Sequence, residues 1–314
     1  MDLSVDLQVA TSSSSIQIID EEIADDSKKV ISPKKIYFTG PYRRQEWSLP
    51  DSIMYYMAMN PKSAAVYQKF VKSCKYFYIK NPILVASCLM YKKEKWQISC
   101  GKQTIDMSNV TPKLWITNDL NVSHYASVNP NLVSPIIQNI YKCDARLVFL
   151  RDQVISFGDF CFLTSNIEEF YFYNTFVKDV DGSIMEFEKL FHILSKAQSV
   201  TFNWKHSLIP KITSKTFDEL LKIPHFATLK YLSLVNIPET FDLDAFYGYM
   251  KKNKLTTLKM YFSGAISEAY KNRIEEIIDE IISTKNHEYK VPLIRYSGID
   301  HQKYHKLHQI CFSH

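Results

Sequence analysis

The stretch Ile167-x-x-Phe170-x-Phe172-x-Asn174 returns with the same spacing as Leu229-x-x-Leu232-x-Leu234-x-Asn236. Both place apolar residues at alternate positions, which is the period of a half-buried β-strand. Ala197-x-x-Val200-x-Phe202 and Leu255-x-x-Leu258-x-Met260 share this frame. The region from about residue 115 therefore predicts a series of strands whose alternate residues point into a common core.

The distance from one strand to the next leaves room for a helix. Shorter versions of the frame at Leu120-x-Val122 and Leu147-x-Phe149 extend the series. Successive strands are 27, 23, 30, 32 and 26 residues apart, counted from Leu120 through Leu147, Phe170, Val200 and Leu232 to Leu258. Thr216-x-x-Glu219 and Asp242 are typical of helix N-termini between the strands. One strand–helix unit cannot bury its own apolar face, so neighbouring units must stack. We expect an α/β chain with an irregular strand–helix solenoid of parallel strands. An ordinary doubly wound sheet is the alternative, because irregular spacing also fits it.

The two ends of the strand series have their own patterns. Residues 96–107 alternate around Gly101 and predict a hairpin, so the hairpin and repeats together occupy residues 91–265. In residues 266–314, Ile274, Ile277, Ile278 and Ile281 form one helical stripe. We expect this last region to be a helical cap on the array.

Residues 1–90 divide into a polar tail and a helical unit. Residues 1–46 contain a serine run and segregated acidic and basic clusters, which predict a flexible tail. In residues 47–90, Ile53, Met54 and Met57 and then Val66, Phe70, Cys74 and Phe77 recur at steps of three and four. This spacing predicts two amphipathic helices, the first of which ends before Pro61.

The helical unit resembles an F-box. Leu49-Pro50 begins it, Asn60-Pro61-Lys62-Ser63 lies midway, and Cys74-Lys75-Tyr76-Phe77 closes it. Tyr55-Tyr56 and Phe77 depart from the usual aliphatic residues and Trp of that motif. The strand series resembles leucine-rich repeats, and the C-terminal part is similar to F-box-like families expanded in nematodes.

This resemblance implies a function in ubiquitin ligation. An F-box followed by repeats resembles the substrate-recognition subunit of a Skp/cullin/F-box ubiquitin ligase. It implies that a Skp-type adaptor protein contacts five residues of the helical unit, and that the repeats hold an unknown protein substrate. The implied adaptor-binding residues are Leu49, Pro50, Ile53, Met54 and Met57.

Strand alternation suggests where a protein substrate would bind. Residues between the inward apolar positions point to the opposite face of the sheet. Aromatic residues there would be effective anchors of a protein interface. We expect Tyr171, Tyr173, Trp204 and Tyr231 to form this substrate-binding surface.

Composition argues against other classes of function. The chain has 7 glycines among 314 residues and no glycine-rich phosphate loop, so the commonest nucleotide-binding signature is missing. The net charge of +5 is too small to indicate a nucleic-acid surface. The longest apolar run, residues 83–91, is too short to span a bilayer. Six cysteines without a C-x-x-C pair suggest reduced thiols in the cytoplasm or nucleus.

Residues that could carry chemistry have simpler interpretations. Asp152, Asp159, Glu168 and Glu169 read as surface carboxylates beside strands, and no nucleophile–base motif is present. His301, His305 and His308 share a helix face but lack further zinc ligands. We therefore expect neither an enzyme nor a cofactor or metal site. A repeat-type binding or structural protein without a ligase link, and an enzyme of unrecognised type, remain alternatives.

Overall fold

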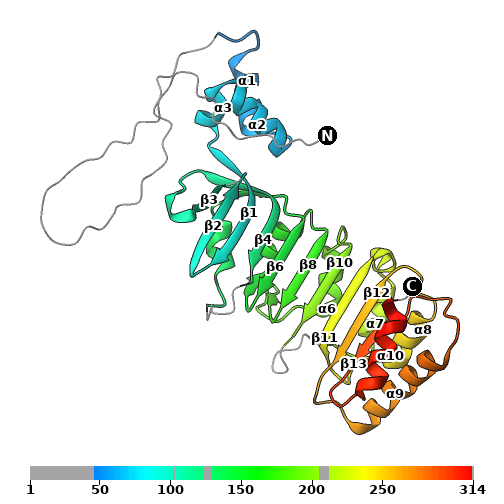
Figure 1. Ribbon diagram of the computed structural model, residues 1–314. Helices are drawn as coiled ribbons and strands as arrows, with labels where there is room; N and C mark the ends of the chain where they lie inside the picture. Colours follow the sequence, from blue (N-terminus) through cyan, green and yellow to red (C-terminus); the bar gives the residue numbers. More distant parts are fainter. Residues whose placement is uncertain (1–45, 102, 124–128, 205–211, 313–314) are drawn as a thin grey trace, which may run out of the picture. The chain divides into compact units, whose positions relative to one another are not determined.

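The computed structural model of the chain describes residues 46–101, 103–123, 129–204 and 212–312 (Figure 1). These residues form two compact units. The first contains the described residues up to Thr117 together with Asn139–Lys142, and the second contains Asn118–Gln138 and the chain from Cys143. The predicted polar tail, residues 1–46, lies outside the described residues except for its last position.

The first unit begins with three helices, α1 (Asp51–Met59), α2 (Ala64–Ser73) and α3 (Lys75–Lys80). The break at Asn60 and Pro61 confirms that the first helix ends before the proline. The Ser63 hydroxyl then caps α2 by accepting a hydrogen bond from the Val66 amide at 3.2 Å. Cys74 has an extended backbone, which separates α2 from α3.

Three antiparallel strands follow in the same unit: β1 (Ile83–Lys92), β2 (Lys95–Cys100) and β3 (Gln103–Asp106). Gly101, at φ +62°, begins the turn between β2 and β3, so the predicted hairpin is confirmed. Residues 83–90, which the sequence placed in the helical unit, are strand instead. A short apolar run has no decisive period, and here pairing with β2 determines its structure.

The rest of the chain alternates short strands and helices, with 3₁₀ turns at η1 (Met107–Asn109) and η2 (Pro224–Thr228). The further strands are β4 (Lys113–Val122), β5 (Ile140–Cys143), β6 (Leu147–Arg151), β7 (Val154–Ser156), β8 (Glu169–Tyr173), β9 (Phe176–Lys178), β10 (Ser199–Asn203), β11 (Tyr231–Ile237), β12 (Thr257–Phe262) and β13 (Leu293–Arg295). The further helices are α4 (Val133–Ile137), α5 (Phe157–Thr164), α6 (Phe187–Ile193), α7 (Thr216–Leu221), α8 (Leu243–Met250), α9 (Glu268–Ser283) and α10 (His301–Phe312).

Eleven strands belong to one mixed sheet, with the order β13-β12-β11-β10-β8-β6-β4-β1-β2-β3 and β5 beside β4. The strands from β6 to β13 are parallel to their neighbours, whereas β1, β2 and β3 are antiparallel. The chain is thus α/β, but the predicted architecture of an F-box-like helical unit followed by a leucine-rich-repeat-like solenoid with a helical cap is wrong. Alternating residues identify each strand, yet they do not encode its partner, and hydrogen bonding joins hairpin and parallel strands in one sheet.

The C-terminal region also differs from the prediction. The isoleucine stripe of α9 is buried as expected, and the Ser267 hydroxyl caps that helix. Residues 293–295, however, form β13, which pairs in parallel with β12. Residues 266–314 are therefore not a purely helical cap, because part of them extends the sheet.

The core of the second unit lies between the sheet and helices α5 to α8. Val200 is in register with Phe170 and Leu232, and Phe202 is in register with Phe172 and Leu234. All six side chains are at most 2% exposed, which confirms the predicted inward set. Phe160 of α5 and Phe187 of α6 pack edge-to-face on this layer.

The opposite face of the same strands carries polar and aromatic side chains. Helix α10 packs on this face of the sheet over β12 and β13. Figure 1 shows it in front of β13. Among the described residues, no helix combines the length and apolar character needed to cross a membrane.

Candidate functional site

The first candidate surface lies on α1 and the residues before it. Leu49 and Ile53 are 47% and 46% exposed, and Pro50 is exposed too. Met54, by contrast, is 4% exposed, and Met57 packs partly against the core. The structure therefore leaves Leu49, Pro50 and Ile53 available to a partner, whereas Met54 supports the helix from within.

Other apolar residues join this surface. We define the α1 surface as Leu49, Ile53, Tyr55, Tyr56 and Met59, all of which are exposed. Ile53 and Tyr56 are three residues apart, which places them on one side of the helix, and Leu49 lies just before the Pro50 N-cap. With Ile79 of α3, these residues make up six of the eleven exposed large hydrophobic side chains in the described part of the chain. In the sequence, apolar residues occupy almost every side of α1, more than one packed side needs. This pattern could have predicted that Tyr55, Tyr56 and Met59 are exposed.

The α1 surface rests on a packed core. Met54 and Ala58 face Cys74, Tyr76 and Phe77. Phe70 stacks on Phe77 with ring centroids 4.6 Å apart, and Trp47 meets Tyr76 edge-to-face at 5.8 Å. Exposure of the α1 side chains is thus a property of a folded helix rather than of a frayed end.

A hydrogen-bonded tyrosine ties α2 to the start of β1. The Tyr67 hydroxyl donates to the Asn81 carbonyl at 2.7 Å and accepts from the Ile83 amide at 3.0 Å. Burial raises the pKa of Tyr67 to about 12, so the hydroxyl stays protonated and can do both. This contact connects the helices to β1 within the first unit.

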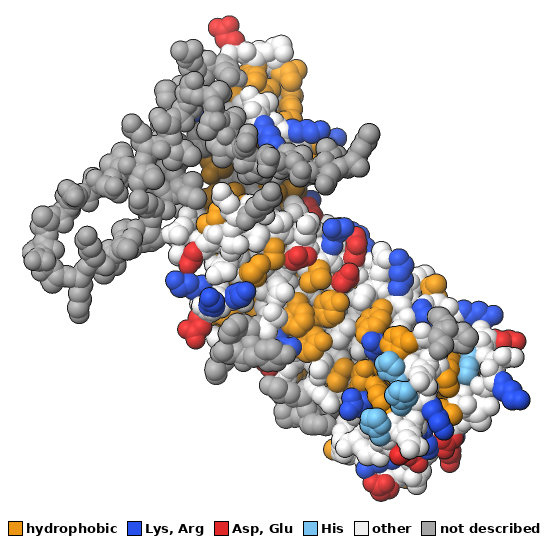
Figure 2. Space-filling model, in the orientation of Figure 1, with side chains coloured by type: hydrophobic (Ala, Val, Ile, Leu, Met, Phe, Trp, Pro, Cys, Tyr) orange, Lys and Arg blue, Asp and Glu red, His pale blue; other side chains and the backbone are white. Residues whose placement is uncertain are grey.

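The second candidate surface is the open face of the parallel strands. We define the tyrosine face as Phe149, Tyr171, Tyr173, Tyr231, Lys259 and Tyr261, all half-buried. The predicted residues Tyr171, Tyr173 and Tyr231 alternate with the buried set and do lie here. Figure 2 shows hydrophobic side chains gathered over these strands with charged residues among them.

Stacking orders the tyrosine face. Phe149 of β6 stacks on Tyr171 and Tyr173 of β8, with ring centroids 5.7 Å and 5.0 Å apart. The Arg151 guanidinium lies 5.0 Å from the Tyr173 ring and 5.5 Å from the Phe149 ring. Phe149 and Arg151 were absent from the predicted surface. The repeating frame counted Leu147 and Phe149 among the inward residues, and this prediction is wrong. Val148 and Leu150 are the buried residues of β6, in register with Phe170 and Phe172 of β8, so Phe149 points to the open face.

Trp204 does not belong to this surface. It is 0% exposed, stacks on Phe202 at 5.4 Å and meets Phe187 of α6 edge-to-face at 5.1 Å. Its prediction as an outward residue is wrong because positions 202 and 204 have the same parity and point to the same, helix-covered side. Trp204 therefore stabilises the core.

The tyrosine face has its own electrostatic character. The Tyr171 hydroxyl donates to the Glu169 carboxylate at 3.3 Å, and burial, followed by this carboxylate, raises the pKa of Tyr171. Burial also raises the pKa of Tyr261, with smaller effects from Tyr304 and Tyr231. Both hydroxyls consequently remain neutral near pH 7; that of Tyr171 donates to Glu169, and that of Tyr261 can donate to a bound protein.

The carboxylates considered for catalysis have local structural roles. Asp152 accepts a hydrogen bond from the Asn174 side-chain amide, and Asp159 accepts one from the Ser134 hydroxyl at 2.8 Å. Glu168 and Glu169 are exposed. In the described part of the chain, no group of three or more His, Cys, Asp or Glu side chains is arranged to hold a metal ion, and His301, His305 and His308 are exposed on α10.

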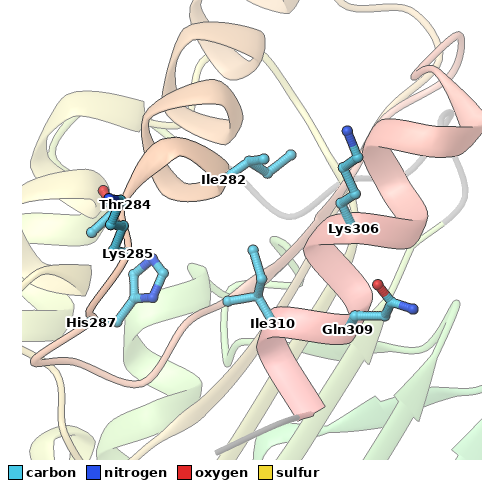
Figure 3. Close-up of a pocket in the computed structure, with 7 residues that line it drawn as sticks. All are labelled: Ile282, Thr284, Lys285, His287, Lys306, Gln309 and Ile310. Carbon is cyan, nitrogen blue, oxygen red and sulfur yellow. The ribbon is translucent and has the colours of Figure 1, made fainter.

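A shallow groove of about 360 Å³ lies between the end of α9 and α10. Ile282 and Ile310 extend into it from the two helices, with Lys285 and Lys306 around them (Figure 3). The His287 ring donates through Nε2 to the Ile281 carbonyl, 3.0 Å away, and so helps to end α9. The lining contains no carboxylate or thiol that could work with His287 as an acid–base pair.

Comparisons with known proteins give no further guide to function. The sequence matches no family model, and the searches of curated proteins and of solved structures return no match.

Proposed function

We propose that this chain is a protein-interaction adaptor that serves as a substrate-recognition subunit of a Skp/cullin/F-box ubiquitin ligase. The observation that carries the proposal is the α1 surface, where a folded three-helix unit exposes clustered aliphatic and aromatic side chains. Large apolar clusters on a folded surface are typical of protein interfaces. The resemblance of residues 49–77 to an F-box gives the partner: a Skp-type adaptor.

The division of residues within α1 supports this role. Met54 and Ala58 hold the helix to α3, while Ile53 and Tyr56 face away from that core. Aromatic side chains carry much of the energy in many interfaces, and Tyr55 and Tyr56 add two of them. The surface can therefore bind a partner without rearranging the helices beneath it.

The tyrosine face is the proposed binding site for the protein to be modified. Its aromatic rings are held by stacking and by the Arg151 guanidinium, so little side-chain entropy is lost when a partner binds. The α1 surface and the tyrosine face are separate sets of residues. Substitutions can therefore test them independently.

Binding of a purified Skp-type adaptor to the full chain tests the proposal. Ile53→Asp combined with Tyr56→Asp places two charges on the α1 surface and should reduce affinity by at least about 100-fold, since each buried unpaired charge costs several kcal/mol. Lys69→Asp, an exposed position on α2, is the matched control and should bind normally. Failure of the unaltered chain to bind the adaptor, or equal binding by the charged variant, would overturn the proposal.

A further inference from the structure

Helix α10 shows that the open face of the sheet accepts a helix. The Arg295 guanidinium on β13 lies 5.3 Å from the Tyr304 ring, and Lys259 Nζ on β12 lies 5.6 Å from the Phe312 ring. Both aromatic residues belong to α10, Tyr304 three residues before and Phe312 five residues after the buried Leu307. The buried Leu307 thus anchors the helix, and aromatic side chains on either side of it contact cations on the strands.

Contacts between a cation and an aromatic ring also occur on the strands beside α10. Lys259 Nζ also lies 5.4 Å from the ring of Tyr231 on β11. Tyr231 is close enough to Tyr171 and to Tyr261 to contribute to the raised pKa of both, although burial is the larger cause. Lys259 thus contacts both α10 and the rest of the tyrosine face.

Small side chains lie at the centre of this region. One register row runs across four strands through Tyr171, Thr201, Ser233 and Lys259. Thr201 and Ser233 are 5% and 4% exposed, so the larger side chains around them cover them. We define the central strip as these two residues with Tyr171, Tyr231 and Lys259. A partner would therefore meet the rings and the Lys259 ammonium rather than the two small residues.

The strands beneath the central strip offer a partner only their side chains. Backbone hydrogen bonds pair β10 with β8 and β11, and pair β11 with β10 and β12. An extended peptide therefore cannot add here as a new strand, which requires a free sheet edge. A helix has no such requirement, because it satisfies its own backbone and presents a ridge of side chains.

Charge defines the partner further. Lys259 forms no ion pair within the described part of the chain, and its ammonium rests on aromatic rings. A carboxylate at that point would gain a charge-assisted hydrogen bond. Tyr171 already donates to Glu169, so the rings are left to contact an apolar or aromatic residue.

From these observations we propose that the central strip binds an α-helix of the client protein, one that presents an aromatic residue to Tyr171 and Tyr231 and a carboxylate to Lys259. The inference rests on the client-binding role proposed above and names the kind of client segment. Within this chain, α10 is a helix that packs on the adjoining strands, although it meets Lys259 with the Phe312 ring rather than with a carboxylate.

The test uses the full chain and two displayed peptide libraries. One library consists of stabilised helices with randomised surface positions, and the other of extended, proline-containing peptides. Helices that carry an aromatic residue and a carboxylate should be enriched. For a selected helix, fluorescence anisotropy should show a loss of affinity of at least about tenfold on Lys259→Glu, the scale of one charge pair. Lys252→Glu, at an exposed position just after the end of α8, should bind normally.

Two further variants separate the outcomes. Ser233→Arg should block the central strip, and Tyr231→Ser should weaken binding with less effect on folding. Enrichment of extended peptides alone, enrichment of neither library, or a selected helix that binds Lys259→Glu and Tyr231→Ser normally would overturn the inference. The Ile53→Asp/Tyr56→Asp variant should bind the selected helix normally. Its result with the Skp-type adaptor therefore tests the ligase proposal separately.

Discussion

The ammonium group of Lys259 lies 5.4 Å from the Tyr231 ring and 5.6 Å from the Phe312 ring, so one side chain contacts both the open sheet face and α10. Phe312 is 55% exposed, whereas Leu307 is fully buried. The attachment of α10 therefore depends on one apolar anchor, with cations and aromatic rings around it.

This arrangement predicts that Leu307→Ala loosens α10 more than Phe312→Ser does. Removal of a buried leucine side chain costs about 2–5 kcal/mol, but the loss of an exposed ring costs roughly 0.5 kcal/mol. Hydrogen exchange measured by mass spectrometry should show faster exchange over residues 301–312 in Leu307→Ala, with exchange in β8 and β10 unchanged. Equal protection of α10 in both variants would show that the cations hold the helix.

The aromatic core on the helix side of the sheet gives a second prediction. Phe202→Ala and Trp204→Ala should each reduce the free energy of unfolding by about 3–5 kcal/mol, because both rings are fully buried. Tyr231→Ser, on the opposite face, should cost about 1 kcal/mol or less. Urea unfolding of the three variants measures this. A small effect for Trp204 would mean that its ring faces solvent.

Strand positions could be predicted from the sequence because alternation is local, but the partners of each strand could not. The pattern at Phe170 and Phe172 identified both the strand and its buried side correctly. The same rule was misapplied at two positions: the frame at Phe149 was one residue out of register, and Trp204 has the same parity as the buried Phe202. The union of β1–β3 with the parallel strands depends on hydrogen bonds between distant segments, which no local pattern contains.

Asn236 combines a strained backbone with two hydrogen bonds. Its φ is +67°, and its side-chain amide donates to the Trp204 carbonyl and to Asn203 Oδ1. Asn236→Gly removes the hydrogen bonds but tolerates this φ, whereas Asn236→Ala also introduces strain. The alanine variant should therefore be less stable than the glycine variant by about 1 kcal/mol. Equal stabilities in thermal unfolding would show that the backbone relaxes.

The Tyr67 hydroxyl provides a fourth prediction. Tyr67→Phe leaves the Ile83 amide and the Asn81 carbonyl without their buried partner, while the ring still packs near Trp115 at 6.5 Å. The loss should be about 1–3 kcal/mol of unfolding free energy. Tyr55→Phe, at an exposed tyrosine of α1, removes the same atom and should change the stability by less than about 0.5 kcal/mol. A Tyr67→Phe variant as stable as the unaltered chain would show that water replaces the hydroxyl.

The α1 surface could be predicted only in part from the sequence. Spacing placed Ile53 and Met54 together in one apolar set, and the resemblance to an F-box assigned both to a partner. Which side of α1 packs inward depends on where Phe77 and Tyr76 of α3 lie, and that contact appears only in three dimensions. Neighbouring residues of similar hydrophobicity thus have opposite environments.

Ile53 and Met54 supply the last prediction, because adjacent positions should respond in opposite ways to the same substitution. Ile53→Ala removes a side chain that is 46% exposed and should change the free energy of unfolding by roughly 0.5 kcal/mol. Met54→Ala empties a position between Ala58 and Phe77 and should cost about 2–5 kcal/mol. If the α1 surface binds a Skp-type adaptor, Ile53→Ala should weaken that binding by at least about tenfold, in the range of an interface residue that contributes over 1 kcal/mol. Isothermal titration calorimetry and urea unfolding of the same two proteins measure both quantities. An Ile53→Ala variant that loses stability would place Ile53 in the core, and one that keeps both stability and affinity would move the adaptor contact elsewhere.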